Sequence, residues 1–152
     1  MGLNAVVLDT QTFVWTLHAS TDLGATARGR IGRASPVYVP PGSFHEIRVK
    51  HRARTWPLPD SDVQALPQRL ARQGGMLAPY TAAMAMFAGG RDRDHRDPFD
   101  RVIAATAMDL GCPLISGDAA FDGSDGRPGW PGRLWQGRKS PLGRIGRPET
   151  CR

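Results

Sequence analysis

Short runs of β-forming apolar residues alternate with helix-length segments along most of the chain, and this alternation constrains the fold more than any other feature. Residues 5–8 (AVVL) predict a buried strand, and TFVWTL after Asp9 has apolar residues at helical spacing. Residues 37–39 (VYV) predict a second strand, and Pro41 suits the first turn of a helix through GSFHEIRVKHR. Each strand passes directly into a helix, which is the pattern of a βα unit.

The middle of the chain continues the pattern with weaker signals. Residues 60–73 (DSDVQALPQRLARQ) predict a helix, with acidic residues at its start and arginines at its end, that Pro67 shortens or kinks. Met76 and Leu77 predict a short strand, and the segment AAMAMF that follows predicts a helix. A third strand–helix pair is therefore expected here.

The last strong elements lie between residues 98 and 135. Residues 98–110 place apolar side chains on one helical face, and Gly111 is expected to end that helix. Residues 113–116 (PLIS) predict a buried strand, and Leu134 with Trp135 resembles a last strand. The whole alternation predicts the α/β class, with a mostly parallel sheet covered by helices on both faces.

Length and cysteine content limit the class of protein. A chain of 152 residues that is 40% hydrophobic suits one packed domain. Cys112 and Cys151 form no CxxC pattern and are too few for a disulfide framework, so a reducing compartment, the cytoplasm, is expected. The apolar run at residues 5–8 is too short for a signal peptide or a membrane span, so we expect no membrane association.

The net charge of +6 is confined to the C-terminal part of the chain. Residues 127–152 carry seven basic side chains and one acidic side chain, and the rest of the chain is electrically balanced. Beyond Trp135 the sequence is rich in Gly, Pro and Arg. We therefore expect a folded domain over residues 1–135 and a basic, disordered tail over residues 136–152.

Four acidic residues are expected at one edge of the sheet. Asp9 and Asp118 follow predicted strands, Glu46 lies early in a helix that follows a strand, and Asp100 lies in the first turn of the helix before PLIS. Open α/β sheets bind ligands at the carboxyl ends of their strands. Residues distant in sequence can therefore converge on one site.

Each acid also has a simpler interpretation. Asp9 and Asp118 are good N-caps for the helices after their strands, and Glu46 could lie on a solvated surface. Asp97, which precedes a proline, is well explained as the cap of the 98–110 helix. Capping explains Asp100 least, because it aligns with alanines at the edge of the buried stripe.

Converging carboxylates repel one another unless a cation or protons neutralise them. Hard divalent ions with oxygen ligands, Mg²⁺ or Mn²⁺, suit such a group, whereas the scattered histidines argue against zinc. Such ions activate water and stabilise charge on a phosphodiester during hydrolysis.

Three segments together resemble a known family. VVLDTQTFVW, VYVPPGSFHEIRVKHR and HRDPFDRVIAATAMDLGCPLISGDAAF are similar, in order and spacing, to PIN-domain ribonucleases, and most closely to the VapC-type toxins of bacterial type II toxin–antitoxin pairs. The resemblance spans roughly residues 4–135. It implies a PIN-like three-layer α/β/α fold.

The resemblance also assigns roles to residues of this chain. By position, the family's acidic catalytic and metal-binding residues correspond to Asp9, Glu46, Asp100 and Asp118. The supporting positions correspond to Thr10, Ser116 and Asp97. Arg101 and Arg96 are candidates for contact with substrate phosphate or an antitoxin, and a structural ion pair is an open alternative for each.

The implied function is that of an endoribonuclease toxin dependent on Mg²⁺ or Mn²⁺, in which a metal-activated water attacks the scissile RNA phosphate. A VapB-like antitoxin would neutralise it, and a homodimer is implied. The alternative is a catalytically inactive PIN-like module whose acidic groove binds a basic protein partner.

Overall fold

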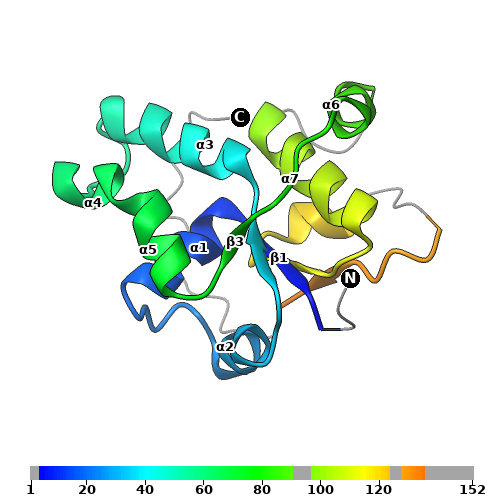
Figure 1. Ribbon diagram of the computed structural model, residues 1–152, viewed down its shortest axis with the longest axis horizontal. Helices are drawn as coiled ribbons and strands as arrows, with labels where there is room; N and C mark the ends of the chain where they lie inside the picture. The colour runs from blue at the N-terminus through cyan, green and yellow to red at the C-terminus, as the bar shows by residue number, and fades with distance from the viewer. Residues whose placement is uncertain (1–3, 91–96, 124–127, 136–152) are drawn as a thin grey trace.

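A computed structural model describes residues 4–90, 97–123 and 128–135 (Figure 1). The predicted tail, residues 136–152, lies outside the described residues, as does Arg96. The helices are α1 (Thr10–Leu17), α2 (Ala25–Gly32), α3 (Pro41–Arg52), α4 (Asp60–Gln64), α5 (Leu66–Arg72), α6 (Ala82–Gly89) and α7 (Pro98–Leu110), with a 3₁₀ helix η1 (Ala119–Gly123). The strands are β1 (Val6–Leu8), β2 (Val37–Val39), β3 (Met76–Leu77), β4 (Leu114–Ile115) and β5 (Arg133–Leu134).

The five strands form one parallel sheet in the order β3-β2-β1-β4-β5. The central strand β1 pairs with β2 through Val6 and Val37, and with β4 through Leu8 and Ile115. The prediction of an α/β fold with a mostly parallel sheet is confirmed. Since β1, β2 and β4 run in the same direction, their carboxyl ends lie along one edge of the sheet.

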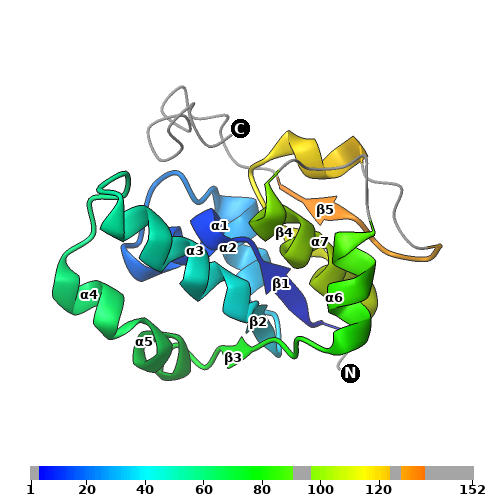
Figure 2. The same cartoon turned by 90° about the horizontal axis from the view of Figure 1, so that it is seen from above.

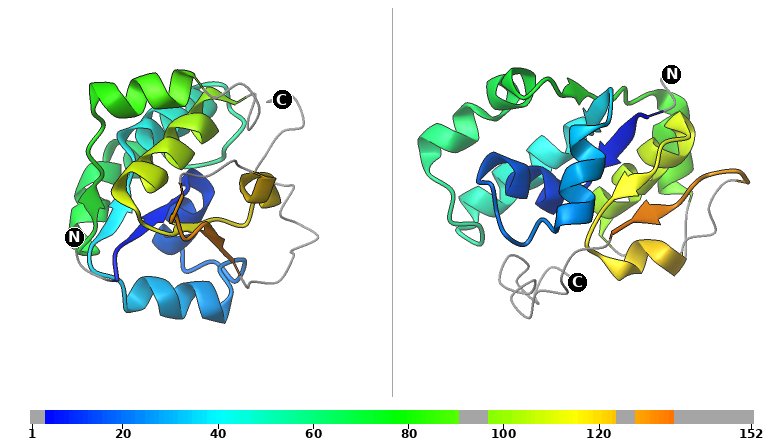
Figure 3. Two further views of the ribbon diagram at one scale, coloured as in Figure 1. Left: turned by 90° about the vertical axis from the view of Figure 1, so that its right-hand side faces the viewer. Right: turned by 90° about the horizontal axis from the view of Figure 1, so that it is seen from below.

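Alternate residues of β1 enter two separate apolar cores. Val6 and Leu8 pack with Phe13 of α1 and Ala27 of α2, whereas Val7 packs with Ile103 of α7. Figure 3 shows α2 and α7 on opposite sides of the strands, and Figure 2 shows α6 beside α7. The sheet is thus covered on both faces, which confirms the three-layer α/β/α arrangement.

Helix α7 has the bounds that the sequence predicts. Pro98 occupies the first turn, and Gly111 ends the helix with a left-handed φ of 65°. Ala104 and Ala107 are fully buried against the sheet, because small side chains allow the helix to approach closely. The site depends on this close packing, since α7 carries Asp97 and Asp100.

Other elements differ from the predictions in detail. The predicted 60–73 helix is instead divided at Ala65 into α4, which ends at Gln64, and α5, which begins at Leu66 and carries Pro67 in its first turn. The last strand is Arg133–Leu134, so the prediction of Leu134–Trp135 was wrong by one residue. Trp135 instead packs on Trp15 of α1, with ring centroids 5.5 Å apart. This contact attaches the end of the described chain to the first helix.

Within the described residues, no helix is long and apolar enough to cross a lipid bilayer.

Candidate functional site

Asp9 joins three elements at the carboxyl edge of the sheet. It follows β1 and caps α1, and its Oδ1 accepts a hydrogen bond of 2.7 Å from the backbone N–H of Thr12. Its Oδ2 accepts a hydrogen bond from the hydroxyl of Ser116, at the end of β4. The Asp9 side chain is buried, with 3% of the residue exposed. The N-cap interpretation is therefore correct, but the same carboxylate also faces the neighbouring strand.

A second set of contacts ties α1 to α3. The Thr10 hydroxyl donates a 2.5 Å hydrogen bond to Oε2 of Glu46 and lies 3.0 Å from the Ser43 hydroxyl. Oε1 of Glu46 forms an ion pair with Lys50, one turn later in α3. Glu46 is 2% exposed, so the alternative of a solvated surface position is wrong.

Asp118 is linked to Asp9 through Ser116, whose hydroxyl contacts both residues. The Ser116 hydroxyl accepts a 3.0 Å hydrogen bond from the backbone N–H of Asp118. Oδ1 of Asp118 accepts a 2.9 Å hydrogen bond from the N–H of Ala120, the second residue of η1. Asp118 is half-buried and caps this short helix, as the simpler interpretation predicts, while its backbone is fixed to the residue that contacts Asp9.

The two aspartates at the start of α7 have different environments. Asp97 is half-buried and accepts a 2.9 Å hydrogen bond from the N–H of Phe99, which confirms it as the N-cap. Asp100, one turn further on, is only 4% exposed. The ring of Phe99 meets His45 of α3 edge-on, with centroids 5.2 Å apart. The first turn of α7 therefore packs on the same part of α3 that carries Glu46.

Arg133 of β5 brings a cation to this edge of the sheet. Its Nη1 donates a 3.0 Å hydrogen bond to the carbonyl of Ser116, and its guanidinium pairs with Asp122 in η1. The hydrogen bond with Asp122 raises the pKa of Arg133, and the negative charges of Asp118 and Asp9 raise it further. The same hydrogen bond lowers the pKa of Asp122.

The structure brings four of the predicted residues into direct contact: Asp9 with Ser116, and Thr10 with Glu46. Arg101, the residue after Asp100 in α7, is half-buried.

Sequence reasoning missed three residues of this region: Ser43, Lys50 and Arg133. Lys50 lies four residues after Glu46, a spacing at which helical side chains meet, and this was a signal for the ion pair. In the sequence, Arg133 stands out only as one of the basic residues of the C-terminal part of the chain.

The donor atoms fit a hard divalent cation by their chemistry. The hydrogen-bonded groups are carboxylate and hydroxyl oxygens, the ligands that Mg²⁺ and Mn²⁺ prefer. In the part of the chain that the structure describes, however, no three acidic, His or Cys side chains gather closely enough to hold an ion. Ion binding would therefore require the acidic side chains to draw closer together.

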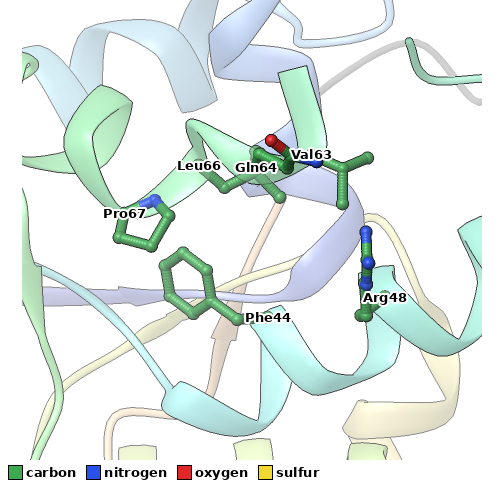
Figure 4. Close-up of a pocket in the computed structure, with 6 residues that line it drawn as sticks. All are labelled: Phe44, Arg48, Val63, Gln64, Leu66 and Pro67. Carbon is green, nitrogen blue, oxygen red and sulfur yellow. The ribbon is translucent and has the colours of Figure 1, made fainter. Parts of the chain in front are cut away.

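A shallow hollow of about 220 Å³ lies elsewhere, between α3 and the α4–α5 pair (Figure 4). Its lining residues are Phe44, Arg48, Val63, Gln64, Leu66 and Pro67. None of these is a predicted site residue. We call the sheet edge that carries Asp9, Glu46, Asp100 and Asp118 the acidic edge. Helix α3 contributes Glu46 to the acidic edge, and it contributes Phe44 and Arg48 to the hollow.

The fold and the acidic edge define a class of protein: a three-layer α/β/α protein with buried carboxylates at the carboxyl ends of its parallel strands. The sequence model of the PIN domain matches residues 6–126, and the chain belongs to the PIN-domain family. PIN domains are typically nucleases that use divalent metal ions such as Mg²⁺ and bind RNA substrates. No curated protein gives a significant match to this chain.

The hydroxyl of Thr12 leads to a stability prediction next to the site. Thr12 is fully buried, and its Oγ1 has no hydrogen-bond partner among the described residues. Thr12→Val has the same shape and removes an unsatisfied polar group, so we expect the free energy of unfolding to rise by about 1 kcal/mol. Urea denaturation measures this change. Thr10→Val is the control, because it removes a bonded hydroxyl and should lower stability; equal losses in both variants would contradict the prediction.

Proposed function

We propose that this PIN-domain protein is an Mg²⁺- or Mn²⁺-dependent endoribonuclease and the toxin of a toxin–antitoxin pair. Asp9, Asp100 and Asp118 are assigned to the ion, and Glu46 completes the acidic site. The observation that carries the proposal is the burial of three of these acids, from three different elements, at the carboxyl edge of a PIN-domain sheet. Buried carboxylates are costly unless they are paired, and such groups concentrate at functional sites.

The chain's own residues prepare the site in three ways. Ser116 fixes one oxygen of Asp9 and the N–H of Thr12 fixes the other, so this carboxylate keeps one orientation. Thr10 fixes Glu46 in the same manner from the neighbouring helix. Such preorganisation reduces the reorganisation needed when charge develops in the transition state.

When bound, the ion would supply an activated water and neutralise charge on the scissile phosphate. Arg101 is assigned to substrate phosphate or to the antitoxin, because a guanidinium group binds phosphate or carboxylate oxygens through paired hydrogen bonds. Arg96 receives the same assignment. A VapB-like antitoxin and a second copy of the chain are the protein partners that this proposal includes, and its cellular location is the cytoplasm.

The proposal predicts metal-dependent cleavage of RNA by the purified protein. RNA of mixed sequence would be incubated with the protein in Mg²⁺, in Mn²⁺ and in excess EDTA, and the products would be separated on a denaturing gel. We expect cleavage with either ion, none with EDTA, and products with 5′-phosphate and 3′-hydroxyl ends. Cleavage that persists in EDTA would contradict the metal requirement. Absence of cleavage, with retained binding of a small basic partner, would support the inactive module instead.

A further inference from the structure

The ion pair between Glu46 and Lys50 places a lysine side chain directly beside one carboxylate of the acidic site. Lys50 is 6% exposed and Glu46 is 2% exposed, so both charges are removed from water. Burial of two charges is tolerated only when each is paired and hydrogen-bonded. The pair is therefore a buried ion pair within α3 and not a surface contact.

Both carboxylate oxygens of Glu46 are engaged by the protein itself. Oε1 pairs with the Lys50 ammonium, and Oε2 accepts the Thr10 hydroxyl at 2.5 Å. A divalent ion on either oxygen would lie close to the ammonium, where like charges repel strongly at low dielectric. Glu46 is thus poorly suited to be a ligand while Lys50 keeps its position.

Lys50 is held in that position by its surroundings. Its ammonium lies 4.8 Å from the ring centre of Trp56, a distance typical of a cation–π contact, and Trp56 is itself buried. The Lys50 carbonyl accepts hydrogen bonds from the backbone N–H of Thr55, at 3.0 Å, and from the Thr55 hydroxyl, at 3.1 Å. Movement of the ammonium into solvent would break the ion pair and the contact with Trp56 together.

We propose that Lys50 is the internal counter-cation of the acidic site, so that Glu46 acts as a positioning residue for Thr10 and not as a ligand of the divalent ion. The proposal rests on the proposed function, because it assumes that the site takes such an ion. Asp9, which precedes Thr10 directly, is held in place by the same part of α1. The pair thus orients the start of α1 while adding no net charge to the site.

The decisive measurement is Mn²⁺ affinity in the double variant Glu46→Gln/Lys50→Met, determined by calorimetry without RNA. The double variant removes one charge of each sign, so the net charge is unchanged and no buried charge is left unpaired. The amide that replaces the Glu46 carboxylate keeps an oxygen that can accept the Thr10 hydroxyl, and Asp9 keeps its hydrogen bonds from Thr12 and Ser116. We therefore expect the dissociation constant to stay within about threefold of the unmodified protein, whereas loss of a direct ligand should weaken binding by at least the tenfold or so that loss of an outer-shell partner can cost. A tenfold loss in the double variant would overturn the proposal.

Lys50→Met alone tests the counter-cation directly. It removes the positive charge that repels a divalent ion near Glu46, so we expect Mn²⁺ to bind about tenfold tighter. Arg48→Met is the matched control, because it removes one positive charge from an exposed position of the same helix and should leave affinity unchanged. Equal affinity in Lys50→Met and Arg48→Met would overturn the proposal. If Lys50→Met does not fold, the double variant decides alone.

Failure of this proposal is distinguishable from failure of the proposed function. If the protein binds Mn²⁺ but cleaves no RNA, only the proposed function is contradicted. If the protein cleaves RNA but its double variant binds Mn²⁺ tenfold more weakly, only the proposed role of Lys50 is contradicted. An unmodified protein that binds no Mn²⁺ overturns both.

Discussion

Asp9→Asn should lower metal-dependent RNA cleavage by about a hundredfold or more, a loss of the size seen when one preorganised electrostatic group is removed from an active site. The change removes the charge but keeps the shape of the side chain. The amide oxygen can still accept the hydrogen bond from Thr12, since Asn is as good an N-cap as Asp. The Ser116 hydroxyl can accept from the new amide group. The fold should therefore survive, while the ion would lose the ligand that we propose for it at Asp9.

The measurement compares initial rates of cleavage at saturating Mn²⁺, with circular dichroism to confirm folding. Asp60→Asn is the matched control, because its side chain is 85% exposed on α4 and the same charge is lost far from the acidic edge. Figure 2 shows α4 at the opposite end of the molecule from β5. Activity that Asp9→Asn retains would point to a contaminating nuclease.

Much of the fold could be predicted from local sequence because the strongest signals are local. Helix α7 combines a capping Asp97, a proline in its first turn and a terminating Gly111, and its bounds are as predicted. Helix α2 was not predicted, since ATARGRIG has no apolar stripe and only Ala27 of this helix is buried. Tertiary packing supports such a helix, and periodicity does not reveal it.

The candidate site was only partly predictable for a different reason. Parallel strands bring their carboxyl ends to one edge, and this rule indicated where Asp9 and Glu46 would lie. It says nothing of which hydroxyl or ammonium meets each carboxylate. Ser43 approaches Thr10 from a helix 33 residues away in sequence, and Ser116 approaches Asp9 from 107 residues away. Contacts of this kind depend on the packed structure.

The same limit explains why Glu46 had two open interpretations. A helical wheel places it off the face of Ile47, which suggested a solvated surface. The side of α3 that carries Glu46 is instead covered by α1, and the Thr10 hydroxyl of α1 donates a hydrogen bond to the Glu46 carboxylate. Helix α3 is therefore buried on more than one side, and a single apolar stripe underestimates the buried surface of such a helix.

Asp100→Asn and Asp97→Asn form a matched pair within one helical turn, and we expect opposite results from them. Both variants lose one negative charge near the N-terminus of α7, which costs each about 0.3–1 kcal/mol of stability through the helix dipole. Asp97 is half-buried and caps the helix through Phe99, a role that Asn fulfils equally well. Its replacement should leave RNA cleavage within a few-fold of the unmodified protein.

Asp100 should behave differently because its carboxylate is buried at the first turn of α7, where that helix packs on α3. Its replacement should lower cleavage by about a hundredfold or more, as for Asp9. Rates at saturating Mn²⁺ and unfolding midpoints in urea, measured for both variants, separate the loss of chemistry from the loss of stability. Equal losses of cleavage at equal stability would mean that Asp97 also serves the ion. Full activity in Asp100→Asn would remove α7 from the metal site.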